Sequence, residues 1–377
     1  MTRLLVLPFL LFSLIATAQK SLSRSEADTL TLKLANEWKA ERRTHYETAM
    51  ATGCITYDSL RMRLFANVFG HKVPEGGRSL WISLHGGGTA PAAVNDQQWH
   101  NQGRLYAPRE GVYVAPRAAY DDWDMHCKPL TDTLYRQLIE MAVACFDVNP
   151  DRVYLLGYSA GGDGVWRLAP RLADRWAAAS MMAGHPGSVS QLNLRNLPYM
   201  IWCGALDAAY NRNSLNASRI LELDSLHAAD PEGYIHEGHI IEGKGHWMER
   251  LDTAAITWMA QHTRNPFPRR IVWRQEEVTQ PSFYWLSAPA DEQKEGNTVR
   301  VEIIGQTVNI TQCDYSHLTI WLNDSLLDLD RKVEVRLNGK RLFRGRLKRT
   351  ETNMRESLSI RGDLRYIFPA KLSVKIK

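Results

Sequence analysis

The protein has 377 residues, of which 44% are hydrophobic and 23% are charged. These fractions are close to those of globular proteins and exclude a largely disordered chain. The length suits one large domain together with a small one. The net charge of +5, from 46 basic and 41 acidic residues, is too small to indicate a nucleic-acid partner.

The N-terminal segment has the pattern of a secretory signal peptide. A basic start at Arg3 is followed by an apolar run over residues 4–16 and by a small-residue cleavage site at residues 16–18. A membrane anchor is the alternative, but the run is shorter than the roughly 20 residues that a bilayer span needs. We therefore expect a signal peptide over residues 1–18, a mature chain that begins at Gln19, and a secreted or periplasmic protein without a membrane span.

The five cysteines are Cys54, Cys127, Cys145, Cys203 and Cys313. They form no CxxC motif and no cluster with histidine, which argues against a zinc site. An exported chain can pair some of them, but their odd number leaves at least one thiol free. We expect neither a metal nor an organic cofactor.

Short apolar runs alternate with helical patterns after a helical stretch over residues 22–51, in which Leu30, Leu34 and Trp38 are spaced for one buried face. Buried strands are predicted at residues 80–84, 111–115, 152–156, 177–182 and 199–203, with a weaker sixth strand at residues 239–242. Strands that alternate with helices predict a mostly parallel sheet covered on both faces. We expect this α/β domain, with its N-terminal helical segment, over residues 19–268.

The pattern changes after two prolines at positions 266 and 268. Short alternating strands are predicted at residues 298–304, 318–322, 333–337 and 341–346, with a tight hairpin at Asn338-Gly339. They predict a small antiparallel β-sandwich domain over residues 269–377. From Arg331 to Lys377 there are 15 Lys or Arg against 4 Asp or Glu, a net +11. We favour a solvated face there; a bound anionic polymer is the alternative.

The strongest motif is G-x-S-x-G at residues 157–161, directly after the third predicted strand and before a helical stretch. This context fits a nucleophile elbow, a strained strand-to-helix turn that exposes a serine oxygen at the carboxyl edge of a sheet. The helix N-terminus also places free N–H groups beside a developing negative charge. We expect Ser159 to be a nucleophile; a glycine-rich turn without catalysis is the alternative.

An HGGG sequence at residues 85–88 follows the first predicted strand. In lipases and esterases such a sequence contributes a backbone N–H to the oxyanion hole, and glycine lets the backbone approach the substrate oxygen without a Cβ. We expect oxyanion donors at Gly86, Gly87 and Ala160, the residue after the nucleophile. An ordinary flexible turn is the alternative.

An acid and then a histidine should follow the nucleophile along the chain. Asp207 lies four residues after the fifth predicted strand, and His246 lies between the weak sixth strand and a helix. A serine is a poor nucleophile until a base takes its proton, and the base needs a carboxylate to fix its tautomer. We therefore predict a triad of Ser159, Asp207 and His246. Asp224 and Asp230 are rival acids, in a stretch where helix caps are expected.

Other residues are weaker candidates. Trp99 and Trp123 are predicted in loops after sheet strands, where they could stack on a sugar or an aryl group; partly buried loop tryptophans are the alternative. His185 follows another strand and could touch substrate. Asp163 is expected to brace the elbow, and His85 to shape the glycine loop and not to act as a second base.

These motifs resemble those of the α/β-hydrolase superfamily. The sequence NPDRVY at residues 149–154, which leads into GYSAGG at residues 157–162, is most similar to secreted polyhydroxybutyrate depolymerases, feruloyl esterases and dienelactone-hydrolase relatives. The resemblance covers about residues 60–265 and implies a serine hydrolase that cleaves carboxylic esters of small molecules or polymers without a cofactor. The HGGG loop departs from the sequence of many depolymerase-type members, which leaves the ester open.

Two other functions are compatible with the motifs. A serine peptidase of the prolyl-oligopeptidase type shares the fold and triad, but such enzymes usually carry a large β-propeller, and only about 60 mature residues precede the sheet here. A non-catalytic carbohydrate- or envelope-binding protein on the same scaffold would be expected to lose a triad member, and the sequence retains all three.

Overall fold

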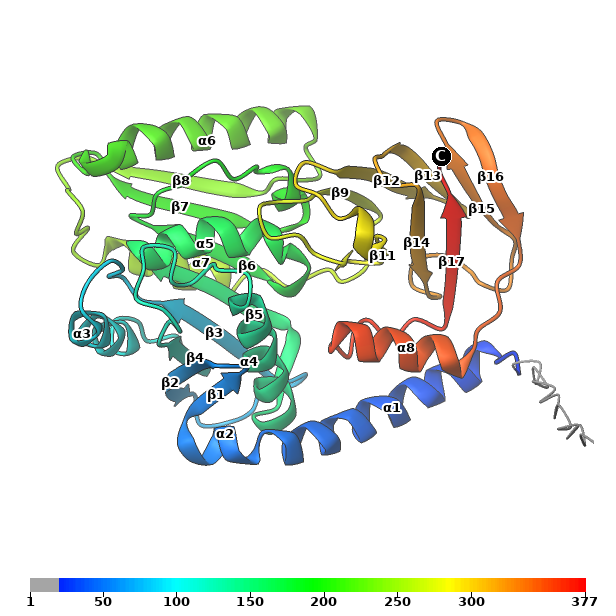
Figure 1. Ribbon diagram of the computed structural model, residues 1–377, viewed down its shortest axis with the longest axis horizontal. Coiled ribbons are helices and arrows are strands. Elements are labelled where there is room, and N and C mark those ends of the chain that lie inside the picture. The colour runs from blue at the N-terminus through cyan, green and yellow to red at the C-terminus, as the bar shows by residue number, and fades with distance from the viewer. Residues whose placement is uncertain (1–19) are drawn as a thin grey trace, which may run out of the picture.

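The computed structural model describes residues 20–377, in which an eight-stranded sheet is followed by two smaller sheets (Figure 1). The predicted signal peptide over residues 1–18 and the predicted start at Gln19 lie outside the described residues.

The large sheet has the strand order β1-β2-β4-β3-β5-β6-β7-β8. Its strands are β1 (Cys54–Tyr57), β2 (Leu60–Phe69), β3 (Arg78–Leu84), β4 (Gly111–Pro116), β5 (Val148–Tyr158), β6 (Ala178–Met182), β7 (Tyr199–Gly204) and β8 (His236–Ile241). β2 pairs antiparallel with β1 and β4, and the strands from β4 to β8 pair in parallel. The mostly parallel sheet is therefore confirmed, with an antiparallel edge before the first predicted strand.

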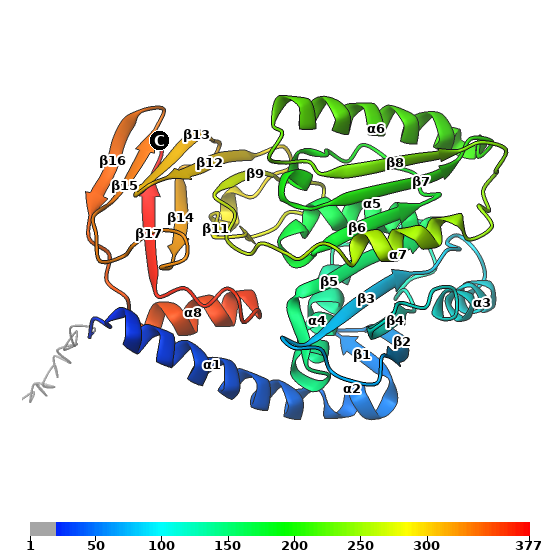
Figure 2. The same ribbon diagram turned by 180° about the vertical axis from the view of Figure 1, so that it is seen from behind.

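Helices cover both faces of this sheet, as predicted. They are α3 (Ala92–Gly103), α4 (Thr131–Cys145), α5 (Ala160–Arg171), α6 (Arg212–Ala229) and α7 (Ala254–Met259). Figures 1 and 2 show α4 and α5 on one face and α3 and α7 on the other. A separate cluster of buried side chains, including Trp81, Tyr113 and Met259, fills the second face. Burial on both sides explains why the central strands are apolar almost without alternation.

The predicted N-terminal helix is divided in two. α1 (Arg24–His45) begins with a capping box, in which the Ser23 hydroxyl accepts from the N–H of Glu26 and the Glu26 carboxylate accepts from the N–H of Ser23. The helix is interrupted at Tyr46, and a second helix, α2 (Glu47–Thr52), follows it. The ring of Tyr46 is buried, and its phenol donates to Glu140 on α4. α1 packs along α4 at one end and along α8 (Glu351–Arg361) at the other (Figure 1).

The C-terminal part contains two packed sheets. Their strands are β9 (Arg270–Arg274), β10 (Ser282–Phe283), β11 (Leu286–Ser287), β12 (Thr298–Ile304), β13 (Thr307–Cys313), β14 (His317–Leu322), β15 (Val333–Leu337), β16 (Lys340–Gly345) and β17 (Ala370–Lys375). The orders are β10-β11-β14-β17 and β16-β15-β13-β12-β9. The predicted Asn338-Gly339 hairpin joins β15 and β16. One pair, β13 and β15, is parallel, because the chain crosses to the other sheet as β14 between them.

The C-terminal sheets are attached to the large sheet by a shared interior. Buried apolar residues of both parts, such as Leu155 on β5 and Trp285 beside β11, belong to one continuous core. Arg264 also binds Asp151 at the start of β5 and Asp363 after α8, and all three residues are at least nine-tenths buried. The packing therefore continues without a break across the proposed domain boundary at residue 268.

Candidate active site

Ser159 occupies a strained turn between β5 and α5. Its φ of 59° is unfavourable for a residue with a side chain, so the surroundings must enforce it. The N–H of Ser159 donates to the carbonyl of Met182 on β6, at 2.9 Å. Gly161 packs so closely on β3 that a Cβ there would lie 2.1 Å from the carbonyl oxygen of Leu84. The second glycine of the motif is therefore required by the approach of α5 to the sheet.

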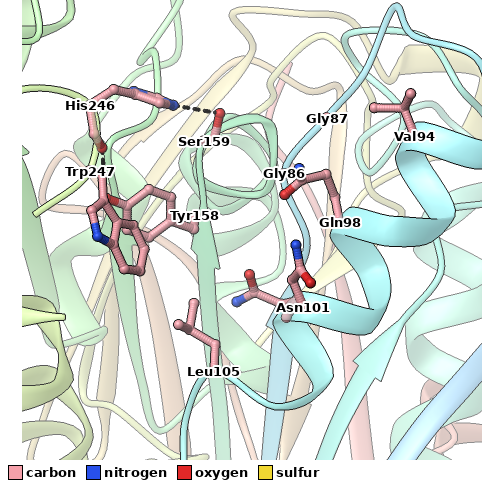
Figure 3. Close-up of a pocket in the computed structure, with 11 residues that line it drawn as sticks. Gly86, Gly87, Val94, Gln98, Asn101, Leu105, Tyr158, Ser159, His246 and Trp247 are labelled. Atoms are coloured by element: carbon pink, nitrogen blue, oxygen red, sulfur yellow. Dashed lines mark hydrogen bonds between the residues drawn. The ribbon is translucent and has the colours of Figure 1, made fainter. Parts of the chain in front are cut away.

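The structure brings the three predicted triad residues together. The Nε2 atom of His246 lies 2.9 Å from the Ser159 hydroxyl oxygen (Figure 3), and its Nδ1 atom lies 2.8 Å from the carboxylate of Asp207. The Asp207 side chain is buried, whereas the His246 side chain is 43% exposed. A proton on Nδ1 that is donated to the carboxylate leaves Nε2 free to accept the proton of the serine. The arrangement suits a nucleophile, a base and an orienting acid.

The two rival acids are bound elsewhere. Asp224 pairs with His236 at 3.1 Å, and Asp230 pairs with Arg195 at 2.7 Å and with Arg270 at 3.2 Å. Neither carboxylate is hydrogen-bonded to a group of the triad.

The order of the strands that precede these three residues identifies the fold. The serine follows β5, the acid follows β7 and the histidine follows β8, at the carboxyl edge of a sheet ordered β1-β2-β4-β3-β5-β6-β7-β8. The chain has the α/β-hydrolase fold. The fold class expected from the sequence is thus confirmed, including the additional β-structure after the hydrolase sheet.

Comparisons with known proteins find partial likenesses to esterases. No family model matches the chain. NocK, described as a candidate esterase of Nocardia uniformis subsp. tsuyamanensis, is 30% identical over 128 residues, which are 32% of this chain and 37% of NocK. A thermostable esterase has a TM-score of 0.42 at 17% identity, over 56% of this chain and 63% of that one. A feruloyl esterase module from Clostridium thermocellum has a TM-score of 0.38 at 12% identity, over 55% and 86%. The chain thus spans less than two thirds of NocK and of the thermostable esterase.

The side chain of Asn95 fixes the conformation of the glycine loop after β3. The N–H of Gly88 donates to the side-chain oxygen of Asn95 at 2.9 Å. Gly87 has a φ of 110°, and a Cβ on it would lie 2.2 Å from the same oxygen. Gly86 and Gly87 line the cavity at Ser159, and Ala160 begins α5, so its N–H has no acceptor within the helix. All three predicted donors thus lie beside the serine, and their role as an oxyanion hole is a proposal.

His85 stabilises this glycine loop from the protein interior. It is fully buried, and its Nδ1 donates to the carbonyl of Gly86 while its Nε2 accepts from the N–H of Ala118. His126 donates to the carbonyl of His85 and accepts from the phenol of Tyr135. Burial favours the neutral form of both rings, because it lowers the pKa of each. Burial, together with the charge of nearby Arg117, lowers the pKa of His85 to about 4. The prediction that His85 shapes the loop agrees with these contacts.

The lowered pKa predicts a loss of stability in acid. An unfolded His85 takes up a proton as the pH falls below about 6.5, whereas the folded one does so only near pH 4, so the free energy of unfolding falls across this window. The expected loss from His85 is about 3 kcal/mol. Denaturant titrations at several pH values should show a flatter profile for His85→Asn than for wild type. His71→Asn, which alters an exposed histidine, should keep the wild-type profile. Equal slopes for His85→Asn and wild type would contradict the prediction.

Tyr158, which the sequence analysis did not single out, fixes the histidine loop. Its phenol donates to the carbonyl of His246 at 2.6 Å and accepts from the N–H of Met248 at 3.1 Å. Because Tyr158 directly precedes Ser159, the strand that carries the serine also positions the base.

Two cavities meet at Ser159 and Gly87. The first has a volume of about 580 Å³, and Figure 3 shows Tyr158 and Trp247 on one side of it and Gln98 and Asn101 of α3 on the other. The second has a volume of about 330 Å³. Its lining includes Trp123, Asp163, Arg167, His185, Tyr210 and Arg212. An ester whose carbonyl is at Ser159 can therefore place one portion in each cavity.

The three weaker candidates have different outcomes. The prediction for Trp99 is wrong: it lies in α3 and not in a loop, it is 7% exposed, and its indole N–H donates to the carbonyl of Ala115. A ring so enclosed cannot stack on substrate. Trp123 and His185 do line the second cavity. Asp163 accepts from the N–H of His185 at 2.6 Å and so braces the elbow against the loop after β6. Substrate contacts by Trp123 and His185 stay predictions.

Within residues 20–377, no group of three His, Cys, Asp or Glu side chains is arranged to hold a metal ion. None of the helices in that same range is both long and apolar enough to cross a membrane. All five cysteines are free thiols, and Cys145 is the one that is partly exposed.

Proposed function

We propose that the protein is a serine hydrolase that cleaves carboxylic esters through an acyl-enzyme. The observation that carries this proposal is the continuous chain of contacts from Ser159 to His246 to Asp207, at 2.9 and 2.8 Å. The strained turn that presents the serine and the glycine loop beside it add the other parts that acyl transfer requires.

The mechanism follows from these positions. The Ser159 hydroxyl attacks the ester carbonyl while His246 takes its proton, and Asp207 stabilises the imidazolium that forms. The N–H groups of Gly87 and Ala160 bind the oxyanion of the tetrahedral intermediate. His246 then protonates the leaving alcohol, which departs and leaves an acyl group on Ser159. Water enters, loses a proton to His246 and releases the acid by the same steps in reverse.

Neither of the other functions is favoured. A peptidase of the prolyl-oligopeptidase type shares this fold and triad, but nothing in residues 20–377 favours a peptide over an ester. A non-catalytic binding protein on this scaffold would not need a Ser159 turn with a strained φ of 59°, nor the hydrogen-bonded arrangement of Ser159, His246 and Asp207.

Labelling with a fluorophosphonate probe tests the proposed function. The wild-type protein should become covalently labelled, because an activated serine attacks the probe, whereas Ser159→Ala should not. Circular dichroism and thermal unfolding establish that the variant is folded. A folded wild-type protein that resists labelling would contradict the hydrolase proposal.

Two further proposals come from the sequence. The expected signal peptide implies export to the periplasm or medium, with a mature chain that begins near Gln19. If the mass of the exported chain gave an N-terminus elsewhere, that result would argue against the signal peptide.

The hairpin of β15 and β16 exposes basic side chains, among them Arg341 and Arg344, that could bind an anionic polymer. Retention on immobilised heparin should then fall in a variant with both arginines changed to glutamine. Unchanged retention would favour a merely solvated face.

A further inference from the structure

The second cavity at Ser159 carries two arginines, each stacked on an exposed aromatic ring. The guanidinium of Arg167, from α5, lies 5.0 Å from the ring centre of Trp123, and that of Arg212, from α6, lies 5.0 Å from the ring centre of Tyr210. Trp123 is 54% exposed and Tyr210 is 76% exposed. Aromatic contact orients a guanidinium while leaving its N–H groups available. Both rings and both cations therefore face the same 330 Å³ space as the nucleophile.

The arginines keep unused hydrogen-bonding capacity. Arg167 is 8% exposed, and within residues 20–377 the buried Nε atoms of both Arg167 and Arg212 lack a hydrogen-bond acceptor. The same Nε of Arg167 forms an ion pair with Glu277 at 3.3 Å but without hydrogen-bond geometry, and the Glu277 side chain is 52% exposed, so solvent weakens the pair. Arg212 lies 3.8 Å from Asp207, which is too far for a hydrogen bond, and that carboxylate already binds His246.

The other titratable groups of the cavity do not cancel both positive charges. Asp163 is the carboxylate of the lining, and its Oδ1 is occupied by the N–H of His185. Burial raises the pKa of Asp163, while the arginines oppose that rise. Burial lowers the pKa of His185, which keeps its imidazole neutral at pH 7. Among the lining residues, two guanidinium groups thus face one carboxylate, while Glu277 and Asp207 lie near these arginines from outside the lining.

The backbone at Tyr210 is consistent with a functional position. Tyr210 and Asn211 have φ values of 56° and 57°, a left-handed conformation that costs free energy in residues with side chains. This pair of residues turns the chain into α6 and places the Tyr210 ring at the cavity beside Arg212. Such strain persists where the surrounding structure enforces it, often at a ligand site.

We propose that this cavity binds a carboxylate of the substrate through Arg167 and Arg212, with the adjoining ring stacked on Trp123 or Tyr210. Paired guanidinium N–H groups match the two oxygens of a carboxylate, and the lining holds one more cation than it holds carboxylates. The substrate class is thus an ester in which a carboxylate is attached to a sugar or aryl ring close to the scissile bond. This inference rests on the proposed ester-hydrolase function of Ser159.

A matched pair of substrates tests the proposal with the full mature chain. 4-Acetoxybenzoate carries a ring carboxylate on the leaving-group side, and 4-acetoxybenzamide is its neutral counterpart. The ratio of their kcat/KM values should favour the anion by about tenfold or more in wild type and should fall about tenfold in Arg167→Gln and in Arg212→Gln. The ratio removes any effect that Arg212→Gln has on Asp207, since both substrates share it. Added salt should lower the ratio in wild type.

Arg219→Gln is the matched control, because Arg219 is also on α6 but pairs with Glu222 outside the cavity, and its ratio should equal that of wild type. As a second readout, 4-hydroxybenzoate should slow fluorophosphonate labelling of Ser159 more than 4-hydroxybenzamide does. A protein that is labelled, but shows no preference for the anion in either assay, would overturn the inference and leave the hydrolase proposal standing. Absence of labelling would instead overturn the proposed function and this inference with it.

Discussion

Replacing Asp207 with asparagine should lower kcat about 10,000-fold while the protein stays folded. The carboxylate of Asp207 now accepts the proton on Nδ1 of His246, at 2.8 Å. An asparagine amide would donate to Nδ1 instead, which moves the ring proton to Nε2. A protonated Nε2 cannot accept from the hydroxyl of Ser159, so the serine would lose its base although every distance is preserved. Steady-state hydrolysis of 4-nitrophenyl acetate measures the loss.

The same substitution at Asp224 provides the control. Asp224 also belongs to the stretch after β7, but its side chain is 58% exposed and pairs with His236 away from the triad. Asp224→Asn should retain wild-type kcat and stability to within about 0.5 kcal/mol. If Asp207→Asn kept more than about a tenth of the wild-type rate, Asp207 would not be the orienting acid of the triad.

The proximity of Ser159, Asp207 and His246 could be predicted because the signal for each residue is local. Ser159 belongs to a short motif whose glycines are dictated by contacts of 2 to 3 Å with neighbouring strands, such as that of Gly161 with Leu84. Asp207 and His246 follow from the order of strands, since the carboxyl ends of parallel strands meet at one edge. No long-range information was needed to place these side chains on the same side of the sheet.

The helix α3 could not be predicted, because its buried face is not apolar. The residues that it buries are Asn95, Trp99, Gln102 and Gly103. Asn95 binds the glycine loop, and Gln102 donates to Ser83 on β3, so two amides take positions that apolar side chains usually fill. The sequence of α3 therefore lacks the 3.6-residue period in hydrophobicity, so the pattern predicts a loop at Trp99, with either a stacked substrate or partial burial for its ring.

The second cavity also could not be predicted from sequence patterns. Its residues come from the glycine loop after β3, from the loop before α4, from the Ser159 turn and α5, from the loop after β6 and from the start of α6. Arg167 and Arg212 are 45 positions apart in the printed sequence and have no motif in common. Only the folded sheet brings their guanidinium groups to the nucleophile.

The attachment of the C-terminal sheets is the largest feature that sequence alone missed. Charged side chains are usually exposed, so arginines and aspartates predict a surface. Here Arg264 donates to Asp363, 99 positions further along the chain, at 2.7 Å, and to Asp151 at 2.8 Å. Arg361 of α8 is likewise bound to Asp174, and both side chains are 3% exposed. An ion network of this kind is visible only when both parts of the chain are folded together.

Replacing Asp363 with asparagine should therefore destabilise the whole protein by about 3–5 kcal/mol. The Asp363 side chain is 4% exposed and is contacted by Arg264 at 2.7 Å and by Arg175 at 3.3 Å. Burial alone would raise its pKa, but these guanidinium groups outweigh burial and hold the pKa of Asp363 at about 2. An amide would remove the charge that both arginines share, so that Arg264 would keep only Asp151, at 2.8 Å, and Arg175 would keep only Asp174, at 3.9 Å. Buried charge that has lost part of its compensation is costly. Such a loss is a large share of the 5–15 kcal/mol that stabilises typical proteins.

Guanidinium or urea unfolding followed by tryptophan fluorescence measures this loss, because Trp176 and Trp285 report on the two parts of the shared core. Asp291→Asn is the control, since Asp291 is exposed, and it should change the free energy of unfolding by less than about 0.5 kcal/mol. Esterase activity of Asp363→Asn at low denaturant should stay near the wild-type value, because the side-chain partners of Asp363 are Arg175, Arg264 and Arg365, and none of these belongs to the proposed triad. A destabilisation below about 1 kcal/mol would mean that the desolvation of Asp363 cancels its attraction to Arg264 and Arg175. The apolar core, and not the ion network, would then hold the C-terminal sheets on the hydrolase sheet.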